Sequence, residues 1–284
     1  MQRIRNSSLS PESMKYQYIH PSPDLARFIR YYWMMEIDSA NFTPEKQRVF
    51  SYACPELTFY YRDAFSLINR NETREAQAPA VLSGQKTTFT DLIPTGHVGI
   101  LSVVFRPQAV RLFFSIPSNH LTDLQVPLTD IDAGAGDLTE EIALLRSTDA
   151  RIMLIENYLR QRICENLVYD FRRIGAGIAL ADQSLAMVTV DQMAGKACLS
   201  PRQFERRFLE FTGLTPKKFL RAVRFQNSLY QKQLDPSLNL TQLAHAAGYY
   251  DQPHFTNEFK AFTGMHPRQY FSANEAWSDY FSLH

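Results

Sequence analysis

The sequence predicts an α+β protein of two domains. The N-terminal domain is expected to be mostly β and barrel-like or sandwich-like. The C-terminal domain is expected to be all-α, with two helix-turn-helix units joined by a long helix. Three observations support this: strand-like segments early in the chain, a repeated pattern in its last third, and a composition of 45% hydrophobic and 13% aromatic residues. Such a composition supplies buried cores and excludes a disordered chain.

Short apolar segments characterise the N-terminal region. Residues 47–53 (QRVFSYA), 57–61 (LTFYY) and 97–105 (HVGILSVVF) are rich in β-branched and aromatic residues, which favour strands. Residues 23–30 (PDLARFIR) and 107–114 (PQAVRLFF) are typical of helix starts. We therefore assign residues 1–135 to the mostly β domain.

A helical linker is expected over residues 136–180, after the break at residues 133–136 (AGAG). Residues 138–146 and 150–166 read as helices, and RIGAG at 173–177 is expected to end the second one. The second of these helices carries an apolar stripe, which can either pack onto the β domain or form a dimer seam. The stripe consists of Ile152, Ile155, Leu159 and Ile163.

The region 181–284 contains the repeat. The two copies are separated by 50 residues at their beginning and by 51 from the first phenylalanine onward, so one residue has been inserted at a turn. Each copy reads as two short helices joined by a tight turn, a shape that places a helix in a DNA groove. The matched pairs include Met193 and Leu243, Phe204 and Phe255, Gly213 and Gly264, and Pro216 and Pro267.

The second helix of the first copy is the stronger candidate for reading DNA. Ser200 is expected to be its N-cap, and Gln203 completes a capping-box pattern. Buried phenylalanines leave Arg202, Glu205 and Arg206 on an exposed stripe near the N-terminal end, which a recognition helix presents to base edges. Arginine can donate two hydrogen bonds to guanine, and glutamate can accept one from cytosine.

The second copy keeps the framework with milder polar groups. Gly248 is expected at its turn and Asp251 at the cap of its second helix. We expect a long helix over residues 216–233 to connect the copies. The candidates for base reading in this copy are Gln252, His254, Thr256 and Asn257.

The net charge of +1 conceals a basic region between residues 196 and 232, which holds nine Lys or Arg against two Glu. Such a cluster can be a solvated helix face, but its position on the repeat favours contact with the DNA backbone. The first unit is therefore expected to supply most of the affinity. The predicted phosphate contacts are Lys196, Arg207, Lys217, Lys218 and Arg221.

The sequence gives little support for a catalytic site or a metal site. The three cysteines form no CxxC pair, which fits a reducing cytoplasm, and Cys198 is expected to be a small packed residue. Cys54 is a poor candidate for a thiolate, and Cys164 is expected in a packed helix. We predict no catalytic residue, no metal site and no cofactor. His20, His97 and His120 are far apart in sequence and form no HxH pair.

No apolar run reaches about 18 residues, and the N-terminus lacks the apolar centre of a signal peptide. We therefore expect a cytoplasmic protein without membrane contact. The terminal segment 277–283 (WSDYFSL) is apolar for a chain end, and we expect it to dock on the protein itself.

Residues 184–272 resemble the C-terminal DNA-binding domain of AraC-type transcription regulators, through LTQLAHAAGYYDQPHFTNEFKAFTGMHPRQY and SPRQFERRFLEFTGLTPKKFL. The resemblance implies two helix-turn-helix units that read successive major-groove segments. It matches the base-reading positions named above. Cys198 departs from the pattern where a turn glycine is usual, and Pro253 and Asn257 depart from it in the second helix.

The front half resembles, less specifically, the sensor domains of such regulators, through PSPDLARFIRYYW, CPELTFYY and VVFRPQAVRLFF. The resemblance implies effector binding or dimerisation. We hypothesise a regulator, either activator or repressor, controlled by an effector or partner. A ligand-independent regulator and a DNA-targeted enzyme resembling DNA-repair methyltransferases are the alternatives. The expected partners are double-stranded DNA and a second copy of the chain, and a small-molecule effector and RNA polymerase are further candidates.

Overall fold

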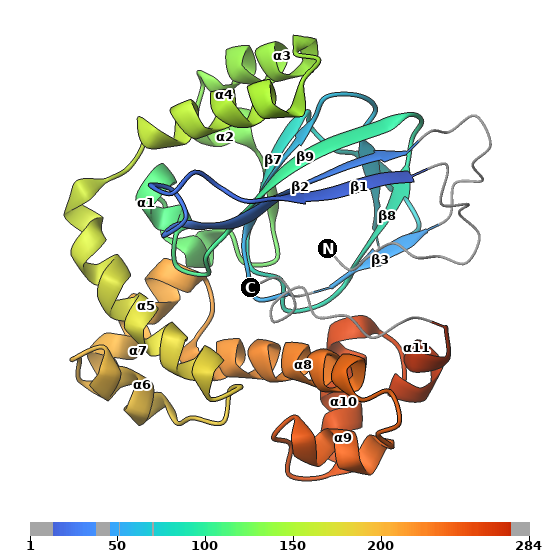
Figure 1. Cartoon of the computed structure of the whole chain (residues 1–284), viewed down its shortest axis with the longest axis vertical. Helices are drawn as coiled ribbons and strands as arrows, with labels where there is room; N and C mark the ends of the chain where they lie inside the picture. Colours follow the sequence, from blue (N-terminus) through green and yellow to red (C-terminus); the bar gives the residue numbers. More distant parts are fainter. Residues whose placement is uncertain (1–13, 38–45, 51, 70, 274–284) are drawn as a thin grey trace.

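The computed structural model describes residues 14–37, 46–50, 52–69 and 71–273. A β domain lies against a helical domain, and the long helix α8 (Pro216–Leu234) runs below the β domain (Figure 1). The predicted α+β class is confirmed. The expected docking segment 277–283 lies outside the described residues. Within the described ranges, no helix is both long and apolar enough to cross a membrane.

Two antiparallel sheets form the β domain, one of six strands in the order β1-β2-β9-β4-β7-β10 and one of four in the order β3-β8-β5-β6. Every residue of β9 is buried, because this strand pairs with β2 and β4 on its two sides. The strands are β1 (Met14–Ile19), β2 (Ile29–Ile37), β3 (Gln47–Val49), β4 (Glu56–Tyr60), β5 (Phe65–Ile68), β6 (Arg74–Ala76), β7 (Ala80–Ser83), β8 (Thr90–Pro94), β9 (Val98–Phe105) and β10 (Gln125–Pro127).

Two sequence predictions for this domain need correction. Residues 23–28 form hydrogen-bonded turns and no helix, and Ile29 already begins β2. Leu25 and Phe28 are nonetheless fully buried, so one turn is enough to bring both side chains to the core. The strand expected over 47–53 extends only over β3. The helix expected at 107–114 forms only over α1 (Val110–Phe114).

Short helices then cover one end of the β domain (Figure 1). They are α2 (Leu128–Ile131), α3 (Ala135–Leu144) and α4 (Thr148–Arg160). Ile155 and Leu159 of the apolar stripe are fully buried within the chain. Glu156 on the same helix accepts hydrogen bonds from Ser22 N at 2.9 Å and Tyr32 Oη at 3.1 Å. These contacts place α4 against the β domain and favour the packing interpretation of the stripe, while a dimer seam elsewhere on the linker stays a prediction.

The helix expected to end at residues 173–177 instead continues through them as α5 (Val168–Gln183). A Cβ added at Gly177 would lie 3.0 Å from the Phe204 ring and 3.2 Å from the Met193 carbonyl oxygen. A larger residue would need Phe204 or the Met193 backbone to shift, so this glycine serves the close packing of α5 and does not break the helix. The preceding helix, α4, ends at Arg160, so Cys164 lies outside any α-helix.

The helical domain contains the two copies of the repeat, linked by α8 (Figure 1). The equivalence includes details of the backbone. Gly213 and Gly264 end equivalent helices with φ of 83° and 70°, and the hydroxyls of Thr212 and Thr263 each donate to a carbonyl oxygen four residues earlier at 2.8 Å. The remaining helices are α6 (Val190–Lys196), α7 (Pro201–Thr212), α9 (Leu240–Ala246), α10 (Gln252–Thr263) and α11 (Pro267–Ala273).

Candidate nucleic-acid interface

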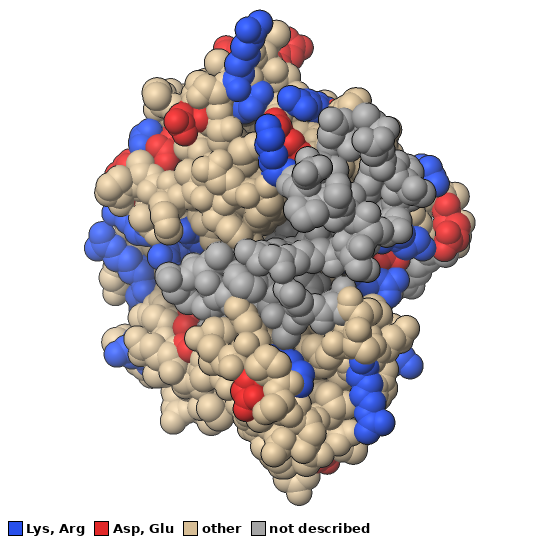
Figure 2. All heavy atoms as spheres, turned by 45° about the vertical axis from the view of Figure 1, so that its right-hand side comes forward, with Lys and Arg blue, Asp and Glu red and all other residues tan. Residues whose placement is uncertain are grey.

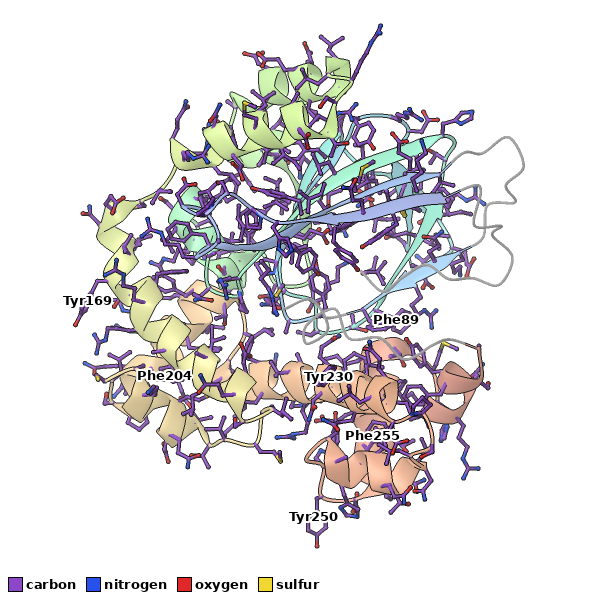
Figure 3. The ribbon with its side chains drawn as sticks, viewed as in Figure 1. Phe89, Tyr169, Phe204, Tyr230, Tyr250 and Phe255 are labelled. Carbon is purple, nitrogen blue, oxygen red and sulfur yellow. The ribbon has the colours of Figure 1, made fainter. Side chains whose placement is uncertain are left out.

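The first recognition helix is α7, and its sequence explains both its start and its orientation. Ser200 and Gln203 form the predicted capping box, with Pro201 at the first helical position. Phe204, Phe208 and Phe211 are fully buried, and the first of these lies within the helical layer in Figure 3. This buried face directs the opposite face of α7 to solvent.

The predicted base-reading residues Arg202, Glu205 and Arg206 are all exposed on that opposite face. In the part of the chain that the structure describes, neither arginine takes part in an ion pair. Their guanidinium groups are therefore available for two hydrogen bonds to a guanine edge. That role stays a prediction.

Cys198 occupies the turn before α7 in a left-handed conformation, with φ of 53°, where the second copy has Gly248 with φ of 81°. Its side chain is exposed, so the expectation of a packed cysteine is wrong. Arg173 of α5 supports this turn, because it donates from Nε to the Ala197 carbonyl oxygen at 3.0 Å and from Nη2 to that of Cys198. These bonds offset part of the strain of a non-glycine residue at positive φ.

The second recognition helix, α10, begins at the predicted N-cap Asp251, whose carboxylate accepts from His254 N at 2.8 Å. Asn257 and His254 are exposed, whereas Gln252 and Thr256 are half-buried. His254 Nε2 lies 3.5 Å from Glu258 Oε1, so a carboxylate stands beside this candidate contact. Gln252 Oε1 accepts from the Thr241 hydroxyl of α9 at 2.7 Å, which fixes the orientation of its amide.

The sequence prediction missed Tyr250 as a candidate contact. This residue immediately precedes the Asp251 cap, is 87% exposed, and projects outward from the second unit in Figure 3. A tyrosine hydroxyl at the entrance to a recognition helix can donate to a DNA phosphate. Its neighbour Tyr249 is buried against Phe255, and only the three-dimensional structure separates the two roles.

The five predicted phosphate contacts fall into two groups. Lys217 and Lys218 are exposed in the first turn of α8, where the helix N-terminus adds positive potential. Lys196 is also exposed. In contrast, Arg221 Nε lies 2.5 Å from Glu258 Oε1, and Arg207 contacts carboxylates of Asp170 at 3.4 Å and Glu210 at 3.3 Å.

The face of the described surface shown in Figure 2 carries basic side chains at several separate places, without a continuous basic band. Arg207 and Arg221 contribute less free positive charge than the sequence alone predicts, because a neighbouring carboxylate partly neutralises each guanidinium. Lys196, Lys217 and Lys218 remain the predicted phosphate contacts with exposed charge.

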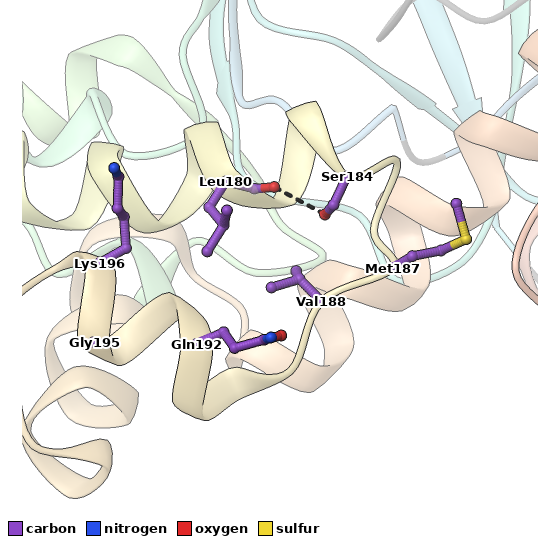
Figure 4. Close-up of a pocket in the computed structure, with 7 residues that line it drawn as sticks. All are labelled: Leu180, Ser184, Met187, Val188, Gln192, Gly195 and Lys196. Carbon is purple, nitrogen blue, oxygen red and sulfur yellow. Dashed lines mark hydrogen bonds between the residues drawn. The ribbon is translucent and has the colours of Figure 1, made fainter.

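Lys196 also borders a groove of about 520 Å³ between α5 and α6 (Figure 4). Leu180, Met187 and Val188 give this groove an apolar wall, and Met187 is 59% exposed. A Cβ added at Gly248 would lie 3.0 Å from Met187 Cγ, so the segment before α6 contacts the turn of the second unit. The two units are thus connected through this segment as well as through α8.

The structure gives no support to a reactive cysteine in the β domain. Cys54 is buried, and burial raises the pKa of its thiol despite the nearby Arg30 guanidinium, whose Nη1 lies 3.5 Å from Sγ. A buried thiol with a raised pKa is a poor nucleophile. Among the described residues, no group of three or more His, Cys, Asp or Glu side chains could hold a metal ion.

Comparison with known proteins finds a family match for each part of the chain. Residues 193–273 match a family described as a helix-turn-helix domain, and residues 17–127 match one described as a domain of unknown function (DUF6597). The transcriptional regulator ArgR of Pseudomonas aeruginosa is 27% identical over 153 residues, 52% of this chain and 44% of ArgR. The transcriptional activator RhaS of Escherichia coli is 28% identical over 134 residues, 45% of this chain and 48% of RhaS. The chain therefore spans less than half the length of these relatives.

Among solved structures, ToxT from Vibrio cholerae aligns with 92% of this chain and 98% of its own, at 10% identity and a TM-score of 0.46. The DNA-binding domain of AdpA, solved with a target DNA, aligns with 35% of this chain and 90% of its own, at 24% identity and a TM-score of 0.33. The sequence matches and the two capped helix-turn-helix units together support an AraC-type helix-turn-helix domain over residues 193–273, preceded by a mostly β domain.

Proposed function

We propose that this protein is a sequence-specific DNA-binding transcription regulator in which α7 and α10 enter successive major-groove segments. The observation that carries the proposal is the pair of capped recognition helices, one of which exposes Arg202 and Arg206 without ion-pair partners among the described residues. Such a helix end presents donors to base edges, while Lys217 and Lys218 are placed to contact the backbone.

We further propose that the β domain controls how the two units are presented to DNA. It binds the C-terminal end of both recognition helices. Ser118 Oγ donates to the Phe211 carbonyl oxygen at 2.8 Å, and Thr122 Oγ1 donates to that of Gly213 at 2.6 Å. These two hydrogen bonds hold the C-terminal end of α7.

The C-terminal end of α10 is also held by the β domain, at the position equivalent to the end of α7. Arg48 Nη1 donates to the Thr263 carbonyl oxygen at 3.2 Å, and its guanidinium stacks on Phe89 at 3.8 Å from the ring centroid. Asp91 accepts from the same guanidinium at 2.7 and 2.8 Å, which fixes its orientation. A ligand or partner that shifts the β domain would therefore change the relative placement of both helices.

The proposal includes a homodimer on DNA, a small-molecule effector at the β domain, and contact with RNA polymerase during activation. The alternative of a DNA-targeted enzyme is less favoured, because the buried Cys54 thiol has a raised pKa. A ligand-independent regulator would use the same DNA surface without the effector.

Selection of bound DNA from a random pool with the full chain tests this function. We expect recovery of a site with two major-groove segments per protein copy, and two such sites if the chain binds as a dimer. Recovery of no sequence preference at low and moderate salt would contradict the proposal. The double variant Ser118→Ala/Thr122→Val loses the hydrogen bonds to the C-terminal end of α7. It is expected to keep the sequence preference and to alter the tolerated spacing between the two major-groove segments.

A further inference from the structure

A pocket of about 460 Å³ lies between α3 and the strand ends of the β domain, within the range of about 300–1,000 Å³ typical of small-molecule sites. Its lining includes the small side chains of Ala64, Ala80 and Ala143. Gly136 of α3 also lines it, and a Cβ added there would meet no heavy atom within 4 Å. Small residues on both sides thus leave space that larger side chains would fill.

Two tyrosine side chains line the pocket, and both have defined orientations. Tyr61 is buried, and its ring has the Arg151 guanidinium 3.7 Å from its centroid. The Tyr61 hydroxyl donates to Glu36 Oε1 at 3.2 Å. The Tyr60 hydroxyl donates to the side chain of Gln77, which also lines the pocket. These contacts preorganise the aromatic surface before a ligand binds, which lowers the entropic cost of binding.

Groups of opposite charge line the same pocket. Arg62, on the strand side, is about half exposed, and its Nη2 lies 3.5 Å from Glu36 Oε1. Because a guanidinium has five N–H donors, this one contact leaves several available, while the Glu36 carboxylate partly neutralises the charge of Arg62. Glu140, on α3, is exposed and has no ion-pair partner among the described residues. The pocket therefore offers a cation for an anionic ligand group and an anion for a cationic one.

We propose that this pocket binds a small zwitterion with an apolar body, which is the chemistry of a free apolar amino acid. Arg62 binds its carboxylate, Glu140 binds its ammonium group, and its side chain packs against Tyr60 and Tyr61. The inference deepens the proposed function and rests on it, because the zwitterion would be the effector of the regulator.

A chain of contacts connects this pocket to the first DNA-reading unit. Gln77 Nε2 donates to Gln125 Oε1 at 2.6 Å, so the Tyr60 hydroxyl is linked through Gln77 to β10. Three residues before β10, Thr122 donates to the Gly213 carbonyl oxygen at the end of α7. A ligand that displaces Tyr60 or Gln77 would thus act on the segment that holds the first recognition helix.

Isothermal titration calorimetry on the full chain tests the site, with L-phenylalanine, L-leucine and L-methionine as probes. Phenylacetate and 2-phenylethylamine, which each lack one charged group of phenylalanine, are the matched comparisons. We expect at least one amino acid to bind. With phenylalanine as the reference, each part-probe is expected to bind about tenfold more weakly or worse, because one charge-assisted contact is lost. The proposal would be overturned if none of the three amino acids binds, or if phenylacetate binds as tightly as phenylalanine.

Gly136→Leu supplies the structural control, because Gly136 lines the pocket and an added Cβ there meets no heavy atom within 4 Å, so a larger side chain can take up pocket space. It is expected to abolish amino-acid binding while leaving the thermal unfolding transition intact. Gly195→Leu is the matched variant, since Gly195 is also helical, has the same open space and lines the other groove. It should bind the amino acid like the wild type. Equal binding by wild type and Gly136→Leu would contradict the assignment.

The same protein samples separate this inference from the proposed function. A chain that selects a DNA sequence but binds none of the probes would disprove the ligand site alone. A chain that binds an amino acid but shows no DNA preference would disprove the regulator and leave the ligand site supported.

Discussion

Arginines in the helical domain differ in how much of their charge is available. Arg206 is exposed on α7 without an ion-pair partner among the described residues, whereas Arg221 contacts Glu258 and Arg207 contacts two carboxylates. An arginine already bound to a carboxylate must exchange that partner for DNA. Exposure and pairing together, rather than charge alone, therefore rank the candidate contacts.

Replacement of Arg206 by alanine is expected to weaken specific DNA binding by about 1–3 kcal/mol and to relax the preference at one base pair. The loss follows from removal of two hydrogen-bond donors to a base edge. Fluorescence anisotropy on the selected site and its single-base variants would measure both effects. Arg146→Ala, an exposed arginine beyond the end of α3, is the control and should leave binding unchanged. An unchanged affinity and preference in Arg206→Ala would remove this residue from the interface.

Lys217→Ala should weaken binding to all sequences alike and reduce the slope of log K against log salt by about one, because one phosphate contact is lost. Arg221→Ala should change this slope less, since its guanidinium is bound to Glu258. Salt titrations of the two variants on specific and random duplexes make the comparison. An equal change for both would show that the ion pair opens on DNA, and a sequence-dependent loss for Lys217→Ala would exclude a simple phosphate contact.

Helices in this chain are specified by local signals at their ends and by close packing along their length. The caps at Ser200 and Asp251 are readable from sequence because each depends on neighbours within three residues. The role of Gly177 is not readable in this way. It depends on Phe204, which lies 27 positions away in the numbering, so a glycine needed for packing resembled a helix breaker.

Alanine at two helical glycines should separate these roles. Gly195→Ala in α6 meets open space and is expected to stabilise the protein by up to about 1 kcal/mol through helix propensity. Gly177→Ala is expected to give no gain or a net loss, because its Cβ meets Phe204 at 3.0 Å and overpacking costs about 1–3 kcal/mol. Urea denaturation of both variants gives the two free energies. An equal gain would mean that α5 has room to move away from α7.

The whole molecule is held together by contacts between its domains that the sequence does not reveal. The repeat and the double helix-turn-helix fold could be predicted because their signals recur within 51 residues. The bonds from Arg48 to Thr263 and from Thr122 to Gly213 join residues 215 and 91 positions apart. No local pattern distinguishes Arg48 from another surface arginine, so the contacts that connect the β domain to the reading helices come from the structure alone.

Another contact between the domains, the hydrogen bond from Arg111 of α1 to Glu210 of α7, should respond to pH. Burial acts to raise the pKa of Glu210, but the hydrogen bond from Arg111 at 2.7 Å and the Arg207 charge outweigh it and lower that pKa below its ordinary value of 4.5. A carboxyl whose pKa is lowered by folding stabilises the folded state above its ordinary pKa, and this stabilisation is lost as the pH falls below that value.

Glu210→Gln should therefore be less stable than wild type at pH 7, with a difference that narrows between pH 5 and pH 3. Chemical denaturation across this range measures the difference directly, because the other acidic groups contribute equally to both proteins. A gap that stays constant with pH would show that the carboxylate charge of Glu210 does not stabilise the contact between α1 and α7.

The two units are expected to be unequal, with the first supplying most of the affinity for DNA. Affinity for the selected site should be compared between Arg202→Ala/Arg206→Ala in α7 and His254→Ala/Asn257→Ala in α10, with salt and DNA held constant. Each pair lies exposed on its recognition helix, and both variants leave the buried phenylalanines untouched. We expect a clearly larger loss of affinity for the α7 pair. An equal loss, or a larger loss for the α10 pair, would contradict it.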